Sequence, residues 1–476
     1  MKKKILLYLI CFFALQIKAQ IIPQNGTKAS SPEFIALKNV SVYIRPGLKI
    51  EKASILISNG KIIDIGKKIT IPKNAIEYDL EGKTIVPAFI ELYTNIGMPK
   101  GSEQNYSPRP QIESSKTGPY YWNEAIHPEI EAHNFFTVDS KANENYLKSG
   151  FGFAVSHVQD GIARGSGTLV SLGDENVSKN TISLKSGMFY SFSKGTSKQS
   201  YPSSQMGSIA LLRQSLYDLK FYSENEKHDQ SISLERWKED IGLPSLFKVN
   251  DKWEILRAEK IASEFQIKMN YIGSGNEYAA LSSLKSVKGA LIIPLNFPEA
   301  YNVKDPYLSR QIPLSDMKHW ELAASNPSLL KNNGNTICLT YNGSKTPEDF
   351  WKNLRKAITR GLKVDDALGA LTMEPAKILK MDTEIGSLEI GKIASFSVYS
   401  SDPFTSDASL LESWLLGEQK VQKSISENSI IGKYTMNING KSYRIEISGS
   451  NEKPAGKVET FKSKDTIQQK ILKNEF

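Results

Sequence analysis

Apolar and polar positions alternate with a period of two from about Phe34 to residue 85, as they do in half-buried strands. The dipeptide Asn59-Gly60 lies between two such runs. This pair favours a tight hairpin, because both of its residues tolerate a positive φ. The pattern therefore predicts a small antiparallel β module over residues 34–85.

From residue 86 the period changes, and short apolar runs alternate with stretches of helical spacing. The predicted strands are 84–93, 289–295 and 336–341, and the predicted helices are 207–222, 253–266 and 346–361. Asp251 and Thr346 are placed to cap the last two helices. Strands that alternate with helices predict an α/β fold around a parallel sheet, and the span 86–384 is the size of a (β/α)8 TIM-like barrel.

After the predicted barrel, the run 394–399 reads as another short strand. We expect residues 385–425 to return to the N-terminal module, so that 34–85 and 385–425 form a composite β-sandwich. A further hairpin is predicted around Asn439-Gly440, and it makes residues 430–476 a partial C-terminal β unit.

Residues 1–19 have the pattern of a secretory signal peptide. Three lysines precede an apolar run from Ile5 to Leu15, and Ala19 supplies the small residue at the cleavage position. The run is shorter than the ~20 residues that span a bilayer. We expect cleavage after Ala19, no membrane anchor afterwards, and a periplasmic or secreted protein. Cys11 lacks the small preceding residue of a lipidated cysteine.

Charge and cysteine content bear on nucleic-acid binding and on disulfide formation. The formal net charge is +9, and loss of the four lysines in residues 1–19 leaves +5, spread without basic blocks. The sequence therefore gives no sign of nucleic-acid binding. Cys338 is the one cysteine after residue 19, so no intrachain disulfide is expected, and its apolar surroundings predict a buried, inert thiol.

Three stretches carry a resemblance to a known family. They are residues 60–66 with 79–90, residues 291–298, and residues 339–392, which include Glu374-Pro375-Ala376 and Gly386-Ser387-Leu388. Together they resemble the amidohydrolase superfamily, closest to its imidazolonepropionase-like branch. The resemblance implies a barrel with a β-sandwich built from both ends of the chain. It also implies hydrolysis of C–N bonds with zinc or another divalent metal at the C-terminal mouth of the barrel.

The chain departs from the family at the positions that carry the chemistry. Tyr93 and Asn95 stand where the family has His-x-His, and Asn342 stands where it has the aspartate of the last strand. No histidine lies in 268–272, where a further ligand was sought. Phenol and amide groups do not replace imidazoles for zinc, and an amide is no general base. These departures predict a metal-ligand-deficient member that holds no metal cofactor.

His157, Asp160 and Arg164 are the candidate substrate-binding residues. His157 ends an apolar strand and precedes a glycine-rich turn, and strand ends of this kind face the functional mouth of a barrel. The three side chains would suit a carboxylate. The alternative to a binding site is a structural loop, in which the glycines allow the turns and an ion pair between Asp160 and Arg164 fixes the shape.

The other candidates carry less weight. His127 and His133, with Glu129 and Glu131, would share a face only in an extended segment, and a packed surface segment is favoured over a metal site. His228 is expected in solvent, and His319 in packing or a local hydrogen bond. Ser166 lacks the spacing of a nucleophile elbow, and Ser204 suits a helix cap.

The sequence thus supports three hypotheses. In the leading one, the protein is a catalytically degenerate amidohydrolase-like domain that acts as the non-catalytic partner, or the N-terminal half, of a tandem hydrolase. In the second, it is an active exported hydrolase of amide or peptide-like substrates with a site rebuilt around His157 and Asp160. In the third, it is a barrel protein that binds a small amide or peptide ligand.

Overall fold

The computed structural model describes residues 33–99, 110–174, 176–225, 227–423, 432–438, 441–450, 453–460 and 468–470. The chain divides into two units, Met1–Gln422 and Lys423–Phe476, and each is described by itself. The predicted signal peptide and the Asn439-Gly440 turn lie outside the described residues.

Strands from both ends of the first unit share one sheet. Its N-terminal strands are β1 (Ile35–Arg45), β2 (Leu48–Ser58), β3 (Lys61–Gly66), β4 (Ile76–Asp79) and β5 (Thr84–Pro87), and its C-terminal strands are β14 (Phe396–Tyr399), β15 (Leu410–Leu415) and β16 (Glu418–Val421). The order is β16-β15-β14-β5-β1-β2-β3, with β4 beside β1. The predicted hairpin at Asn59-Gly60 is confirmed, because β2 pairs with β3 and the two residues have φ of 48° and 73°.

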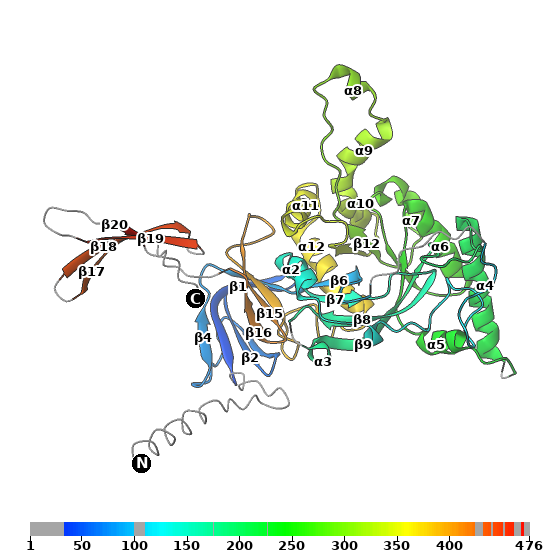
Figure 1. Cartoon of the computed structure of the whole chain (residues 1–476), viewed down its shortest axis with the longest axis horizontal. Coiled ribbons are helices and arrows are strands. Elements are labelled where there is room, and N and C mark those ends of the chain that lie inside the picture. The colour runs from blue at the N-terminus through cyan, green and yellow to red at the C-terminus, as the bar shows by residue number, and fades with distance from the viewer. Residues whose placement is uncertain are drawn as a thin grey trace, which may run out of the picture. The chain divides into compact units, whose positions relative to one another are not determined.

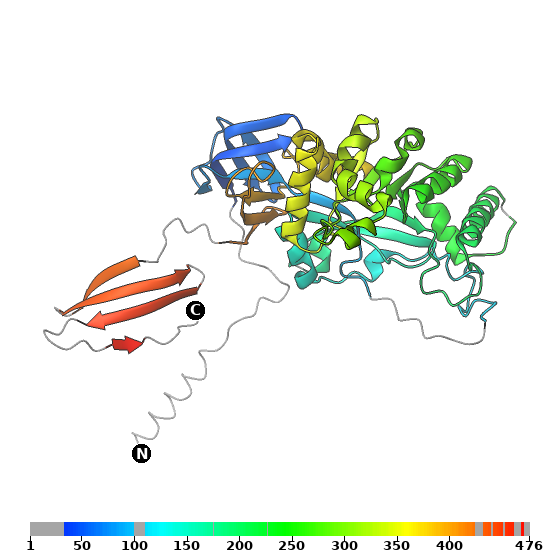
Figure 2. The same cartoon turned by 90° about the horizontal axis from the view of Figure 1, so that it is seen from above.

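The second sheet lies at the centre of the unit (Figures 1 and 2). Its strands are β6 (Phe89–Thr94), β7 (Phe151–Ser156), β8 (Ala163–Ser171), β9 (Thr181–Ser191), β10 (Ser245–Lys248), β11 (Met269–Ile272), β12 (Leu291–Pro294) and β13 (Ile337–Thr340), and the order runs from β13 to β6 without a break. All neighbours pair in parallel except β8, which runs antiparallel to both β7 and β9.

The predicted α/β class is confirmed, but the all-parallel, closed (β/α)8 barrel needs correction. β7 is followed at once by β8 through residues 157–162, where Gly161 has a φ of 80°, so no helix carries the chain back and β8 is reversed. Among the described residues the backbone ladders run from β13 to β6 and leave these two end strands without a ladder between them.

Helices surround the second sheet. They are α2 (Ser140–Lys148), α3 (Val177–Asn180), α4 (Gln205–Glu224), α5 (Ile232–Asp240), α6 (Lys252–Glu264), α7 (Leu281–Leu284), α8 (Pro306–Arg310), α9 (Leu314–Leu322), α10 (Asn326–Asn332), α11 (Pro347–Thr359), α12 (Val364–Leu371) and α13 (Met373–Ile378), with 3-10 turns at Ala132–Asn134, Glu277–Ala280 and Ala323–Ser325. Both predicted caps are confirmed: Asp251 accepts from the amides that follow it, and the Thr346 hydroxyl accepts from the Asp349 amide at 3.2 Å.

Two of these helices differ from the rest. Figure 1 shows α8 and α9 projecting from the helices that cover the sheet, and neither of them buries a residue. In the part of the chain that the structure describes, none of the helices combines the length and the apolar character that a bilayer crossing requires.

The second unit contains a four-stranded antiparallel sheet. Its strands β17 (Gly432–Ile438), β18 (Lys441–Ser450), β19 (Lys453–Thr460) and β20 (Gln468–Lys470) pair in chain order. Ile438 lies opposite Lys441, which is the register of the predicted hairpin.

Candidate functional site

The parallel strands of the second sheet end on one common edge, and in barrel-like folds this edge carries the functional groups. Tyr93 lies near the end of β6, His157 directly follows β7, and Lys248 is the last residue of β10. Arg164, in the reversed strand β8, starts from the same edge. We refer to Tyr93, His157, Arg164 and Lys248 as the mouth centre.

Arg164 is a buried cation with neutral partners. Its Nη1 donates to the Tyr93 hydroxyl at 3.1 Å, its Nη2 to the Ser191 hydroxyl at 2.9 Å, and its Nε to the Gly161 carbonyl at 3.0 Å. The side chain is only 6% exposed, and among the described residues no carboxylate lies within 4 Å of it. Burial of a charge without an opposite charge is costly, so this arrangement is unusual for a purely structural arginine.

Lys248 adds a second positive charge to the mouth centre. Its Nζ donates to the Gly273 carbonyl at 3.2 Å and lies 5.9 Å from the centroid of the Tyr93 ring. Burial lowers the pKa of Lys248; Glu277 partly opposes this shift, and Arg164 adds to it. The two cations therefore influence each other across Tyr93.

His157 is fully buried, and neither ring nitrogen makes a hydrogen bond of normal geometry among the described residues; the Thr94 backbone exerts only a minor influence on the ring. Its ring stacks on Phe189, with centroids 3.6 Å apart and an interplanar angle of 9°, and lies 5.0 Å from the Tyr93 ring. Burial, and secondarily the charge of Arg164, hold the pKa of His157 well below its usual value. The imidazole is therefore neutral at physiological pH.

The structure brings two of the three predicted substrate-binding residues to the mouth centre. His157 and Arg164 both lie beside Tyr93, whereas Asp160 is used elsewhere. Its two carboxylate oxygens accept from the amide and the hydroxyl of Thr196, each at 2.6 Å, and so fix the loop after β9. The alternative Asp160–Arg164 pair is not among the ion pairs of the described residues.

Lys248 was missed by the sequence analysis. A signal was present, because a lysine that ends the short apolar run Leu246-Phe247 is placed at a strand terminus. The segment 268–272, where the resemblance implies a further ligand, forms β11 and the residue before it.

The residues that the resemblance places at metal-binding positions do not suit a divalent cation. The Tyr93 hydroxyl already accepts from Arg164, Asn95 is exposed beyond the end of β6, and Asn342 is a neutral amide after β13. Arg164 and Lys248 add positive charge beside Tyr93. No group of three or more His, Cys, Asp or Glu within reach of one ion occurs among the described residues.

Glu91 is a second buried ionisable group at this edge that the sequence analysis overlooked. One carboxylate oxygen accepts from the Thr340 hydroxyl at 2.7 Å and the Tyr93 amide at 2.9 Å, and the other accepts from the Tyr341 amide at 2.8 Å. Burial raises the pKa of Glu91 to about 7, although these hydrogen bonds oppose the shift. Its side chain thus joins β6 to β13, the two strands that lack a ladder between them.

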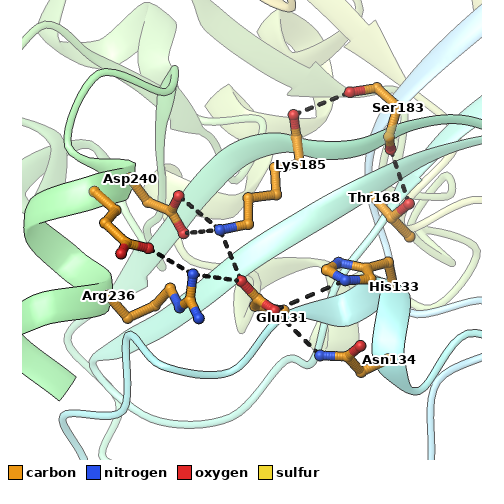
Figure 3. Close-up of polar contacts among 9 residues, drawn as sticks. Glu131, His133, Asn134, Thr168, Ser183, Lys185, Arg236 and Asp240 are labelled. Atoms are coloured by element: carbon orange, nitrogen blue, oxygen red, sulfur yellow. Dashed lines mark hydrogen bonds and ion pairs between the residues drawn. The ribbon is translucent and has the colours of Figure 1, made fainter. Parts of the chain in front are cut away.

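The segment from His127 to His133 forms ion pairs rather than a convergent metal site. Figure 3 shows Glu131 between Lys185 and Arg236, at 2.7 and 3.2 Å, with Lys185 also 2.9 Å from Asp240. His133 is 3.7 Å from Glu131. We refer to Glu131, Lys185, Arg236 and Asp240 as the lateral network. It fastens the segment to β9 and α5, as expected of a packed surface segment.

The remaining candidates behave as ordinary structural residues. His319 receives or donates a hydrogen bond at 3.0 Å with the Tyr278 hydroxyl, as predicted, and the Ser204 hydroxyl caps α4. Cys338 is buried as predicted, and burial raises the pKa of its thiol. His228 is partly exposed and packs one ring face against Tyr222, at 3.7 Å between centroids, so the expectation of a solvent-exposed side chain holds only in part.

A cavity of about 890 Å³ opens at the same edge of the sheet as the mouth centre. It lies where β12 and β13 end, and α11 forms one of its walls. Its volume is within the ~300–1,000 Å³ of typical ligand sites.

The chain is similar to known proteins in part of its sequence and in its fold. Residues 304–432 match the sequence profile of the Amidohydrolase family. The structure is similar to that of an amidohydrolase from Thermotoga maritima MSB8, with 23% identity and a TM-score of 0.64 over 81% of this chain and 99% of that one. No curated protein matches the chain.

Two other solved structures are less similar. A prolidase complexed with N-methylphosphonate-L-proline has 11% identity and a TM-score of 0.48, over 82% of this chain and 100% of that one. A β-aspartyl dipeptidase from Fervidobacterium islandicum AW-1 has 13% identity and a TM-score of 0.44, over 84% and 99%.

Proposed function

We propose that the chain is a catalytically degenerate member of the amidohydrolase superfamily, and that it binds an amide- or peptide-like ligand without metal-assisted hydrolysis. The profile match over residues 304–432 and the fold support this proposal. Superfamily members need a metal to lower the pKa of the attacking water and to polarise the scissile carbonyl. A protein without that metal retains the scaffold and its ligand cavity but loses the nucleophile.

One observation carries this proposal: the mouth centre is cationic. Arg164 and Lys248 lie on either side of Tyr93, which occupies a family metal-ligand position. A divalent cation would be repelled by both side chains, and the neutral amides of Asn95 and Asn342 offer it no charge in return. The same positive potential attracts a ligand that carries a carboxylate.

Metal analysis of the purified full-length protein, together with amidase assays, tests the proposal. We expect zinc, manganese and iron each below about one atom per ten chains after dialysis, and no hydrolysis of N-acetyl amino acids or dipeptides above the background rate. Stoichiometric zinc that disappears in His157→Ala would instead support an active hydrolase with a rebuilt site. An unchanged zinc content in His157→Ala would still remove the claim of a metal-free centre.

We also propose a partner and a location. The basic and apolar pattern of residues 2–19 supports export to the periplasm or the medium. Loss of the catalytic groups supports a role beside a catalytic amidohydrolase whose His-x-His is intact. Crosslinking in the producing cells, followed by mass spectrometry, is expected to recover such a hydrolase. Recovery of the protein alone, as a stable monomer, would contradict the partner role.

A further inference from the structure

The cavity at the ends of β12 and β13 is built by two loops and a helix. The loops contribute Asn296–Ala300 and Gly343–Lys345, and α11 contributes Asp349, Lys352, Asn353 and Lys356. The Asn353 amide donates to the Leu295 carbonyl at 2.6 Å, which fastens α11 to the end of β12. The helix that lines the cavity is thus fastened to the loop after β12.

A close approach between the two loops sets the shape of the cavity. Gly343 has a φ of 89°, and a Cβ there would lie 3.2 Å from the Asn296 Cβ. Glycine at this position therefore allows the loop after β13 to approach the loop after β12. Across the opening, Lys345 and Glu299 form an ion pair at 3.2 Å, and both side chains are largely exposed. Because their charges are opposite, this pair adds no net charge to the cavity.

The charge inside the cavity comes from α11. Lys352 and Lys356 are four residues apart and share one face of the helix. Among the described residues neither lysine has a carboxylate within 4 Å, and Asp349 offsets only one of the two charges. An anionic group of a ligand can therefore lie between the two ammonium groups.

Aromatic side chains form the remaining walls. Lys356 lies 5.9 Å from the centroid of the Phe297 ring, and Trp320 of α9 contributes a ring that is 38% exposed. Large rings that are open to a cavity bury apolar surface when a ligand enters, and they select for a flat or bulky apolar group. The cavity thus combines positive charge on one wall with aromatic surface on another.

We propose that this cavity binds the carboxylate of an N-acylated amino acid or short peptide through Lys352 and Lys356, with its apolar side chain against Phe297 and Trp320. The inference rests on the proposed ligand-binding role and names the class of ligand. It requires no bond to be broken, and it holds whether or not the mouth centre contains a metal.

Isothermal titration of the full-length protein with two probes tests the inference. The probes are N-acetyl-L-phenylalanine and its C-terminal amide, which differ only in the carboxylate charge. We expect saturable binding of the acid and at least about tenfold weaker binding of the amide, a difference that corresponds to one charged contact. Equal affinities, or no saturable binding of either probe, would overturn the inference.

Three variants assign the binding to the cavity. Lys352→Gln combined with Lys356→Gln is expected to weaken the binding of the acid at least about tenfold and to leave the amide unaffected. Trp320→Ala is expected to weaken both probes. Lys363→Gln removes one lysine charge just before α12, away from the cavity, and is expected to change neither affinity by more than about twofold.

Each failure has its own readout. An acid affinity that the double lysine variant leaves unchanged would place the ligand elsewhere and end the cavity assignment. Metal content measured on the same samples decides the proposed function separately: zinc in a protein that binds the acid as expected would overturn the metal-free centre but not the cavity.

Discussion

The lateral network and the mouth centre are both clusters of charged side chains that involve strands of the same sheet, yet their cations have opposite kinds of partner. In the lateral network Lys185 contacts Glu131 and Asp240, and Arg236 contacts Glu131. In the mouth centre Arg164 and Lys248 contact only carbonyls and hydroxyls within hydrogen-bond distance among the described residues. In the first arrangement opposite charges offset the cost of removing the cations from water, and in the second arrangement no opposite charge does so.

The pKa values of the two lysines express this difference. Burial lowers the pKa of Lys185, but the hydrogen bonds with Glu131 and Asp240 outweigh burial, and the pKa is raised. For Lys248 burial dominates, and the pKa is lowered. Lys185 is thus stabilised as a cation by the fold, whereas Lys248 is held as a cation against the preference of its surroundings. Groups of the second kind gather at functional sites.

The largest expected effect comes from removing each lysine in turn. Lys185→Met leaves Asp240, which is 6% exposed, and Glu131 without their shared cation, and we expect it to lower the free energy of unfolding by about 2 kcal/mol. Lys248→Met removes a poorly compensated charge, and we expect a change of less than about 1 kcal/mol, or a gain.

Urea unfolding followed by tryptophan fluorescence measures both changes, because all six tryptophans lie in the first unit. Lys363→Gln, an exposed lysine outside both clusters, serves as the control, with an expected change within about 0.5 kcal/mol. Equal losses in Lys185→Met and Lys248→Met would remove the distinction between the two clusters.

Glu91 is a buried acid whose carboxylate accepts hydrogen bonds from a hydroxyl and from amides, and not from a cation. Its pKa of about 7 exceeds the value of about 4.5 that it takes when unfolded, so the folded state retains a proton that the unfolded state loses first. The stability that this group contributes is fully present below about pH 4.5 and is lost as the pH rises through about 7. His157 acts in the opposite sense, since its lowered pKa makes the folded state lose stability as the pH falls below about 6.5.

Glu91→Gln is expected to remove the loss of stability that the natural protein shows as the pH rises from about 4.5 to about 7. The variant loses stability at pH 5, because an amide NH2 group cannot accept a hydrogen bond as a carboxyl oxygen does from Thr340 or Tyr341. The difference from the natural protein should shrink by about 2 kcal/mol between pH 5 and pH 7. Urea unfolding at five pH values measures it, and a difference that stays constant would show that Glu91 is ionised throughout.

The parts that the sequence predicted well are those set by local chemistry. The turn at Asn59-Gly60 needs two positive φ angles, and the caps at Asp251 and Thr346 need only the amides that follow them. The strand β8 and its reversal were not predicted in this way, because the run Ala163–Ser171 contains two glycines and few apolar residues and its first part was assigned to a glycine-rich turn.

The candidate site was predicted in part for a similar reason. The position of His157 after a strand follows from the apolar run before it, and Tyr93, Asn95 and Asn342 follow from the resemblance. The contact between Arg164 and Tyr93 joins residues 71 positions apart, and it depends on the reversed strand. Asp160 was assigned by its nearness in sequence to His157, but its contacts are with Thr196.

The smallest expected effect concerns His157 itself. Two buried ring nitrogens without a hydrogen bond of normal geometry reduce stability, and the stacking on Phe189 only partly compensates. We expect His157→Leu to raise the free energy of unfolding by about 1 kcal/mol at pH 7, and to raise it further at pH 5.5, where the unfolded state of the natural protein takes up a proton. His319→Leu is the matched control, and it should lose stability because it breaks the hydrogen bond with Tyr278. If His157→Leu lowered the free energy of unfolding as much as His319→Leu does, the His157 imidazole would have hydrogen-bond partners in solution. The polar groups of the mouth centre would then be paired, as those of the lateral network are.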